Sequence, residues 1–161
     1  MLTPLWQWLE QTALAQHIGI TWWFPLLESI HVVALTLVVG SILMIDLRLI
    51  GVAAMRYPAS RIFRELIPWV WGAFAVALPT GFGLFMTRAE HYANNPAFQF
   101  KIGFLVLAGL NMAVFHFRSV RDITAIDDAE VTPAKAKLAG ALSLLLWSGV
   151  ILAGRWTGHL N

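Results

Sequence analysis

The sequence contains no cysteine and few charged residues. The missing cysteine excludes disulfides, thiolate nucleophiles, iron–sulfur clusters and cysteine-ligated zinc. Charged residues make up 12% of the chain and hydrophobic residues 58%, whereas a soluble domain normally carries about 25% charged residues. This composition excludes a disordered chain and an ordinary water-soluble globule. It predicts a membrane protein whose helices are apolar nearly all round, without the clustered basic face that nucleic-acid binding needs.

Long uncharged stretches predict four membrane spans in a single domain over residues 1–161. A membrane helix needs about 20 apolar residues, and stretches of that kind cover residues 23–45, 68–87, 98–117 and 138–156. Before them, Thr3 and Pro4 fit the start of a short helix over residues 4–18, which we expect on the membrane surface. The predicted fold class is all-α, an integral membrane four-helix bundle with a short N-terminal interfacial helix.

The cations favour one orientation of these spans. They gather after the first and third spans, as Arg48, Arg56, Arg61, Arg64, Arg118, Arg121, Lys135 and Lys137. Positively charged loops stay in the cytoplasm, so both termini are expected on the periplasmic side of a bacterial inner membrane. In this interpretation Asp46 and Arg48 close the first span at the inner surface as a topology stop.

Ionisable side chains inside the spans are candidate functional residues, because each costs about 2.5–3.5 kcal/mol on insertion scales. His31 lies in the first span, and neutral imidazole is the commonest metal ligand and the usual axial ligand of haem iron. The alternative is a histidine satisfied by a neighbouring helix, or by Glu28 one turn earlier. His116 lies on the order of 10–15 Å from His31 along the bundle axis, so we interpret it as structural or as part of a proton or quinone path.

Other candidates lie toward the predicted outer side. Gly83, Thr87 and His91 recur at intervals of four and form one stripe if the second helix continues past its predicted end. Such a stripe leaves a flat slot for a planar macrocycle and makes His91 a second candidate metal ligand. The alternative is that the small residues only let helices pack closely.

Lys101 and Arg155 lie at the outer ends of their spans. Both are candidates for pairing with anionic groups such as haem propionates, and the alternative is that their side chains extend to the lipid headgroups. Asn111, in the middle of the third span, is expected to hydrogen-bond across helices.

Short stretches resemble known membrane families. They are Leu26–Leu35 with Gly40 and Asp46–Leu49 after it, and Phe98–Ile102 with Phe115 and His116 after it. With the four-span layout, they resemble the bacterial haem-binding protoporphyrinogen oxidase family and, more loosely, the CopD copper-resistance membrane domain. The resemblance implies a haem b held by His31, with Lys101 near the cofactor or liganding it. The fourth span does not look like the oxidase's, and the chain looks closest to an uncharacterised family of the same layout.

These observations predict a b-type cytochrome-like electron-transfer protein. It would bind one haem near the outer side through His31, with His91 as the other ligand or Lys101 in its place, and quinone is a candidate electron partner. The alternatives are a porphyrin- or quinone-linked oxidoreductase, and a copper-handling or structural membrane subunit. Besides the lipid bilayer, a larger membrane complex or a homo-oligomer is a candidate partner.

Overall fold

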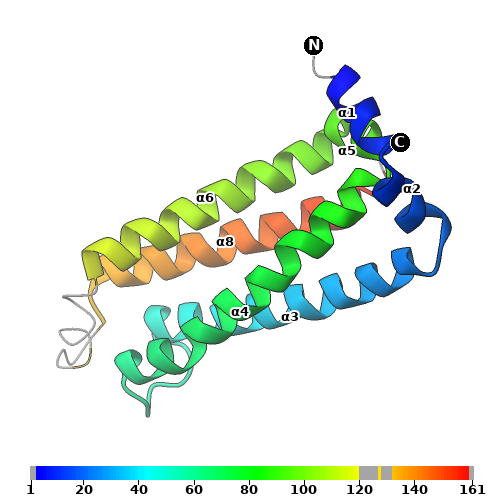
Figure 1. The fold of residues 1–161 in the computed structure, drawn as a ribbon. Helices are drawn as coiled ribbons and strands as arrows, with labels where there is room; N and C mark the ends of the chain where they lie inside the picture. Colours follow the sequence, from blue (N-terminus) through cyan, green and yellow to red (C-terminus); the bar gives the residue numbers. More distant parts are fainter. Residues whose placement is uncertain (1–2, 120–126, 128–131, 160–161) are drawn as a thin grey trace.

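A computed structural model describes residues 3–119, 127 and 132–159, with the side chains of residues 116–119 left out. The elements are α1 (Thr3–Glu10), α2 (Ala13–Ile20), α3 (Trp23–Ile50), α4 (Ala59–Met86), α5 (Ala89–Asn94), α6 (Pro96–Ser119) and α8 (Ala134–Trp156). Four of these helices, α3, α4, α6 and α8, are long and apolar enough to cross a membrane (Figure 1). The predicted all-α membrane bundle is confirmed.

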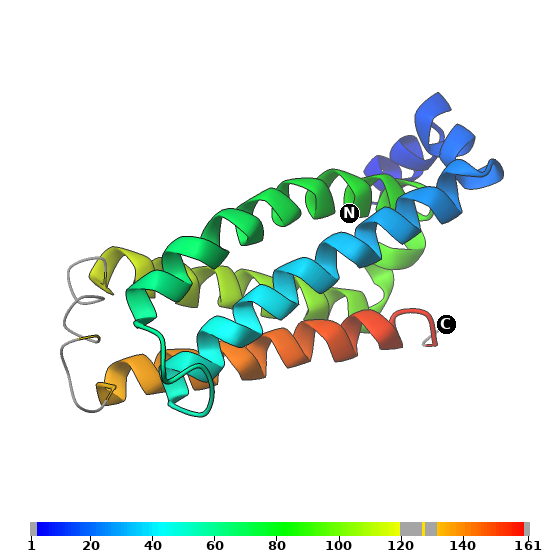
Figure 2. The ribbon, with the colours of Figure 1, turned by 90° about the horizontal axis from the view of Figure 1, so that it is seen from below.

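The bundle has two distinct ends. The short helices α1, α2 and α5 gather at one end with the N- and C-terminal segments, and we call this the terminal end (Figures 1 and 2). We call the opposite end, where α3 joins α4, the loop end. Large apolar side chains such as Val33, Phe82 and Leu145 are exposed on the outside of the bundle, and lipid covers such a surface in a membrane.

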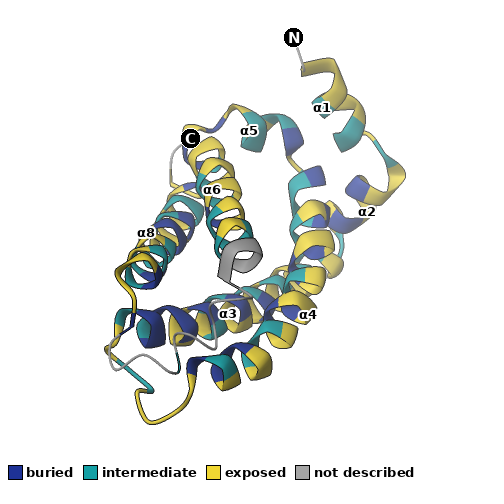
Figure 3. Cartoon of the chain, turned by 90° about the vertical axis from the view of Figure 1, so that its left-hand side faces the viewer, coloured by how far each residue is buried: buried dark blue, intermediate teal, exposed yellow. Residues whose placement is uncertain are grey.

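The four long helices form a ring in the order α4, α3, α8 and α6, as the end view in Figure 3 shows. α3 packs against both α4 and α8, and α8 packs against α6. The buried face of α3 repeats every three or four residues at Ala34, Val38, Ile42 and Ile45, the spacing of one helical stripe. Val38 has no exposed surface, so the centre of the core lies beside it.

α4 and α6 close the ring through aromatic side chains. Phe85 stacks on Phe98 near the terminal end with 5.3 Å between ring centroids, and Phe63 stacks on Phe115 near the loop end at 5.7 Å. Trp6 of α1 contacts Phe85 edge-on at 5.6 Å. Between the two pairs the backbones of α4 and α6 do not pack closely in the described part of the chain. We call the boundary between α4 and α6, from the Phe85–Phe98 pair to the Phe63–Phe115 pair, the α4–α6 seam.

Local signals set the helix ends. Gly51 ends α3 in the left-handed conformation, with φ of 90°, and donates its N–H to the Leu47 and Arg48 carbonyls, as glycine does after helices. Asn95 begins α6 by accepting the N–H of Ala97 at 2.9 Å. Asp127, far along the chain, accepts the first free N–H groups of α4. The Asp127 carboxylate therefore caps the N-terminus of α4.

The helix bounds differ from the predicted ones in two ways. The membrane helices are longer: α3 continues to Ile50, α4 begins at Ala59 and α8 at Ala134, because charged residues end an apolar stretch without ending a helix. The single surface helix predicted over residues 4–18 is wrong, since α1 and α2 are separate. Thr12 accepts the N–H of Ala15 at 3.3 Å and thereby starts a new helix.

Candidate functional site

His31 lies in the half of α3 nearer the terminal end and faces α4. Its Nδ1 atom lies 3.0 Å from the carbonyl oxygen of Ala77 and 3.1 Å from Oγ1 of Thr80. A carbonyl oxygen can only accept, so Nδ1 carries the proton and donates it. The Thr80 hydroxyl donates to the Val76 carbonyl at 2.7 Å, which leaves its lone pairs free to accept.

This hydrogen bond decides which nitrogen of His31 stays available. When Nδ1 of a neutral imidazole is protonated, Nε2 holds the lone pair. Within the described residues, the hydrogen bonds of the ring are all made by Nδ1. Histidines that bind metals typically donate their other N–H to a carbonyl or carboxylate, which orients the ring. His31 therefore has the arrangement of a ligand that offers Nε2.

Gly81 provides the space for this ring. A Cβ atom at position 81 would lie 2.7 Å from Cε1 of His31 and 3.3 Å from Nδ1, closer than real Cβ contacts come. The absence of a side chain at Gly81 thus allows the imidazole to reach the backbone of α4. The residues at 77, 80 and 81 lie on one helix face by their spacing.

Lys101 brings a positive charge to the same region from α6. Its stem runs along Gly154 of α8, where a Cβ would lie 3.7 Å from Cδ, and its ammonium lies 5.8 Å from the centroid of the Phe98 ring. Lys101 lies in the second turn of α6, in the same half of the bundle as His31. No carboxylate in the described part of the chain forms an ion pair with it. An unpaired charge at membrane depth is costly, so this region favours an anionic group.

The other predicted ligand, His91, lies elsewhere. It is exposed on α5, where its ring contacts Tyr92 at 5.6 Å, and no interaction joins it to His31 within the described residues. α4 ends at Met86 and α5 begins at Ala89. The continuous helix assumed for the stripe that leads to His91 is therefore wrong.

The small residues of that stripe contact protein. A Cβ at Gly83 would lie 3.3 Å from the Leu27 side chain, and Thr87 lies 3.7 Å from the Cβ position of Gly19. The predicted flat slot beside Gly83 and Thr87 is thus filled by α2 and α3, and these residues serve helix packing. Arg155 is exposed in the last turn of α8, where its carbonyl accepts from the nearby His159 ring at 3.3 Å.

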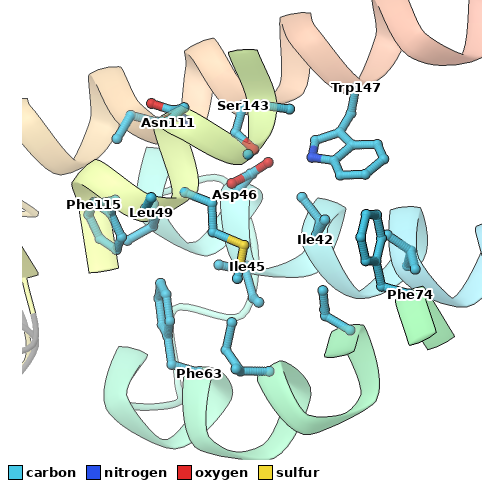
Figure 4. A pocket seen from close by; sticks show the side chains of 18 of the residues that line it. Ile42, Ile45, Asp46, Leu49, Phe63, Phe74, Asn111, Phe115, Ser143 and Trp147 are labelled. Atoms are coloured by element: carbon cyan, nitrogen blue, oxygen red, sulfur yellow. The ribbon is translucent and has the colours of Figure 1, made fainter. Parts of the chain in front are cut away.

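A cavity of about 330 Å³ lies deeper in the bundle, toward the loop end. All four long helices line it, mostly with apolar and aromatic side chains (Figure 4). Its polar side chains are Asp46 of α3, Asn111 of α6 and Ser143 of α8. Asn111 donates to the Ala139 carbonyl at 3.1 Å, which confirms the predicted hydrogen bond between helices.

Asp46 is buried in this wall. Only 4% of the residue is exposed, and its Oδ2 atom has no hydrogen-bond partner among the described residues. Asp46 and Arg48 lie in the last two turns of α3 and both are buried among protein neighbours, and their predicted role as a topology stop stays a prediction. Gly140 lets α8 approach α3 closely at this level: a Cβ there would lie 3.1 Å from the Asp46 carbonyl oxygen.

A model of a family of unknown function, DUF6644, matches residues 5–160. The chain belongs to this family. No match was found among curated proteins or among solved structures. The DUF6644 match covers the His31 region and the cavity alike, and it leaves the resemblance to the oxidase family and CopD as a prediction.

Sequence reasoning missed several residues of this DUF6644 chain. Thr80 and Gly81 hold the His31 ring, and their signal was a polar residue and a glycine side by side within an apolar span. Asp46 was noticed, but its place in the cavity wall was not predicted. The side chain of His116 lies outside the described residues, so its predicted structural or proton-path role stays a prediction.

Proposed function

We propose that the protein binds one haem b through His31 and transfers electrons in the membrane. The observation that carries this proposal is the hydrogen bond from Nδ1 of His31 to the Ala77 carbonyl at 3.0 Å. It leaves Nε2 as the only ring nitrogen with a lone pair, on a ring held by Thr80 and Gly81. The residues present therefore fit a haem with histidine as an axial ligand.

The charges around His31 fit the same group. Haem carries two propionates, and the Lys101 ammonium is without an ion-pair partner in the described part of the chain. Lys101 would neutralise a propionate, a charge-assisted contact that is strong where water is scarce. When bound, haem supplies one-electron exchange, and the chain sets its potential through the axial ligand, burial and nearby charge.

Haem fits the described residues better than a copper site built from side chains. In the described part of the chain, no group of three or more histidine, aspartate or glutamate residues could hold a metal ion. A haem needs one or two protein ligands because the porphyrin supplies four, and His31 meets that need. Lys101 lies in the same half of the bundle as His31, whereas His91 is exposed on α5, so Lys101 is the better candidate for a second ligand. As a ligand it would bind as the neutral amine, in place of its contact with a propionate.

The proposal includes an orientation in a bacterial inner membrane. Exposed cations concentrate at the loop end, at Arg56, Arg61, Arg64 and Lys135. Positively charged ends stay in the cytoplasm, so the terminal end, with His31 in the nearer half of α3, would face the periplasm. Electrons would then be exchanged near the outer surface, and membrane quinone is the candidate partner.

A reduced-minus-oxidised absorption spectrum of the purified protein tests the proposal. We expect b-type haem bands in the wild type, loss of these bands in His31→Ala, and full retention in His159→Ala, the matched control at an exposed histidine. Lys101→Gln should lower haem content or shift the spectrum, whereas His91→Ala should do neither. A wild type without haem after expression with ample haem supply, or a His31→Ala variant with full haem content, would refute the proposal.

A further inference from the structure

The cavity toward the loop end is a candidate binding site separate from His31. Its volume of about 330 Å³ lies at the lower end of ligand pockets, which span roughly 300–1,000 Å³. Phe74 and Trp147 give it flat aromatic walls, while Asp46 and Asn111 add polar groups at one side (Figure 4). Mostly apolar walls with a few converging polar atoms are typical of small-molecule sites.

The polar atoms on this wall have unused acceptor capacity. Ser143 points at the Asp46 carboxyl group and interacts with it, but Oδ2 of Asp46 is buried without a partner in the described residues. Asn111 uses its amide N–H to bind the Ala139 carbonyl, so its oxygen stays available as an acceptor. A buried polar atom without a partner destabilises the protein, because it has lost its hydrogen bonds to water. A ligand that donates hydrogen bonds here would remove that destabilising effect.

We take the α4–α6 seam, which faces lipid, as the route into the cavity. α3 packs on α4 and α8, and α8 packs on α6, so three sides of the ring are closed. The fourth side is the α4–α6 seam, and Phe63 and Phe115 at its loop end also line the cavity. A ligand that passes between α4 and α6 arrives from the bilayer, so it must be lipid-soluble.

We infer that this cavity binds a lipid-soluble ring molecule with hydroxyl groups, of the quinol class, whose hydroxyl donates to Asp46. Flat aromatic walls suit a ring, and the unpartnered acceptor suits a hydroxyl. An acyl chain has no donor to offer Oδ2 of Asp46. This inference concerns binding alone and does not depend on the haem proposal.

Equilibrium binding of a radiolabelled short-chain quinol tests the inference directly. The full-length protein is placed in phosphatidylcholine nanodiscs under argon, and empty nanodiscs measure partition into lipid. We expect saturable binding of one quinol per protein. The oxidised quinone has no hydroxyl to donate, so it should bind about tenfold more weakly or worse, the effect of one lost hydrogen bond to a buried group.

Three variants locate the site. Asp46→Asn keeps the shape and should weaken quinol binding about tenfold. Gly109→Leu should abolish binding, since Gly109 lines the cavity and a Cβ there meets nothing within 4 Å. Gly103→Leu is the matched control: it lies on the same helix, its Cβ also meets nothing within 4 Å, and it is not part of the cavity wall.

The outcomes separate this inference from its rivals. Quinone binding as tight as quinol binding would overturn the role of Asp46 as acceptor. Equal binding by the wild type and Gly109→Leu would overturn the cavity, and so would a phospholipid that co-purifies and is not displaced by quinol. Binding by His31→Ala at wild-type affinity is expected, so a failure of the haem proposal leaves this result unchanged.

Discussion

Replacing Gly81 with alanine tests the arrangement of His31 most directly. The new Cβ would lie 2.7 Å from Cε1 of His31, whereas ordinary contact begins at 3.4 Å, so the ring must withdraw by roughly 0.7 Å. Such a shift takes Nδ1 beyond hydrogen-bonding distance of the Ala77 carbonyl, which is now 3.0 Å away. A buried donor left unpaired costs about 1–3 kcal/mol.

Gly72→Ala provides the reference for this change. Gly72 lies on the same helix and its Cβ would meet nothing within 4 Å, so it shares only the gain in helix propensity, about 1 kcal/mol. We expect Gly81→Ala to unfold with a free energy about 1–3 kcal/mol below that of Gly72→Ala. The haem content of Gly81→Ala should also fall below that of Gly72→Ala.

The assay is equilibrium unfolding in mixed micelles with increasing denaturing detergent, followed by helical circular dichroism, together with haem per protein. Unfolding is measured on haem-free protein as well, which separates the packing of the ring from ligand binding. If both alanine variants have equal stability and equal haem content, the ring does not depend on Gly81 and the reasoning fails.

Three further changes test the close packing of α8 on α3 and the caps of α6 and α4. Gly140→Ala should destabilise the protein by about 1–3 kcal/mol, because the new Cβ would lie 3.1 Å from the Asp46 carbonyl oxygen and the backbone cannot move away. A free energy of unfolding equal to that of Gly103→Ala would contradict this. Asn95→Ala removes the cap of α6 together with the hydrogen bond that Asn95 donates to the Thr157 carbonyl. It should cost at least about 0.5–2 kcal/mol, measured by the same unfolding titration, and no loss would contradict both roles. Asp127→Ala should increase amide hydrogen exchange in the first turn of α4 and leave α8 unchanged; unaltered exchange would refute the capping role.

The sequence was sufficient for the fold class and for two residues of the His31 region. Apolar stretches of membrane length are visible without any tertiary information, and so are His31 and Lys101, because an ionisable residue stands out in such a stretch. How near these two side chains come to one another depends on how α3 and α6 are placed by α8. Only the structure provides that placement.

The choice of glycine was beyond sequence reasoning for a geometric reason. Gly81 and Gly83 both lie against α3: Gly81 faces His31, and Gly83 faces Leu27 one turn earlier on that helix. Which of the two glycines lies beside the histidine depends on how far α4 is shifted along α3, and packing along the whole helix sets that shift. Burial of Asp46 likewise depends on three helices that meet around it.

The α4–α6 seam has a consequence for how events in water reach the membrane interior. The phenylalanine pair at its terminal end is braced by Trp6 of α1, and the pair at its loop end includes Phe63, one turn after the helix start that Asp127 caps. Both braces belong to parts of the chain outside the long helices. A partner or ion that displaced Trp6 or Asp127 would loosen the phenylalanine pair beside it. Binding events at either membrane surface would then change how easily a molecule passes from the bilayer between α4 and α6.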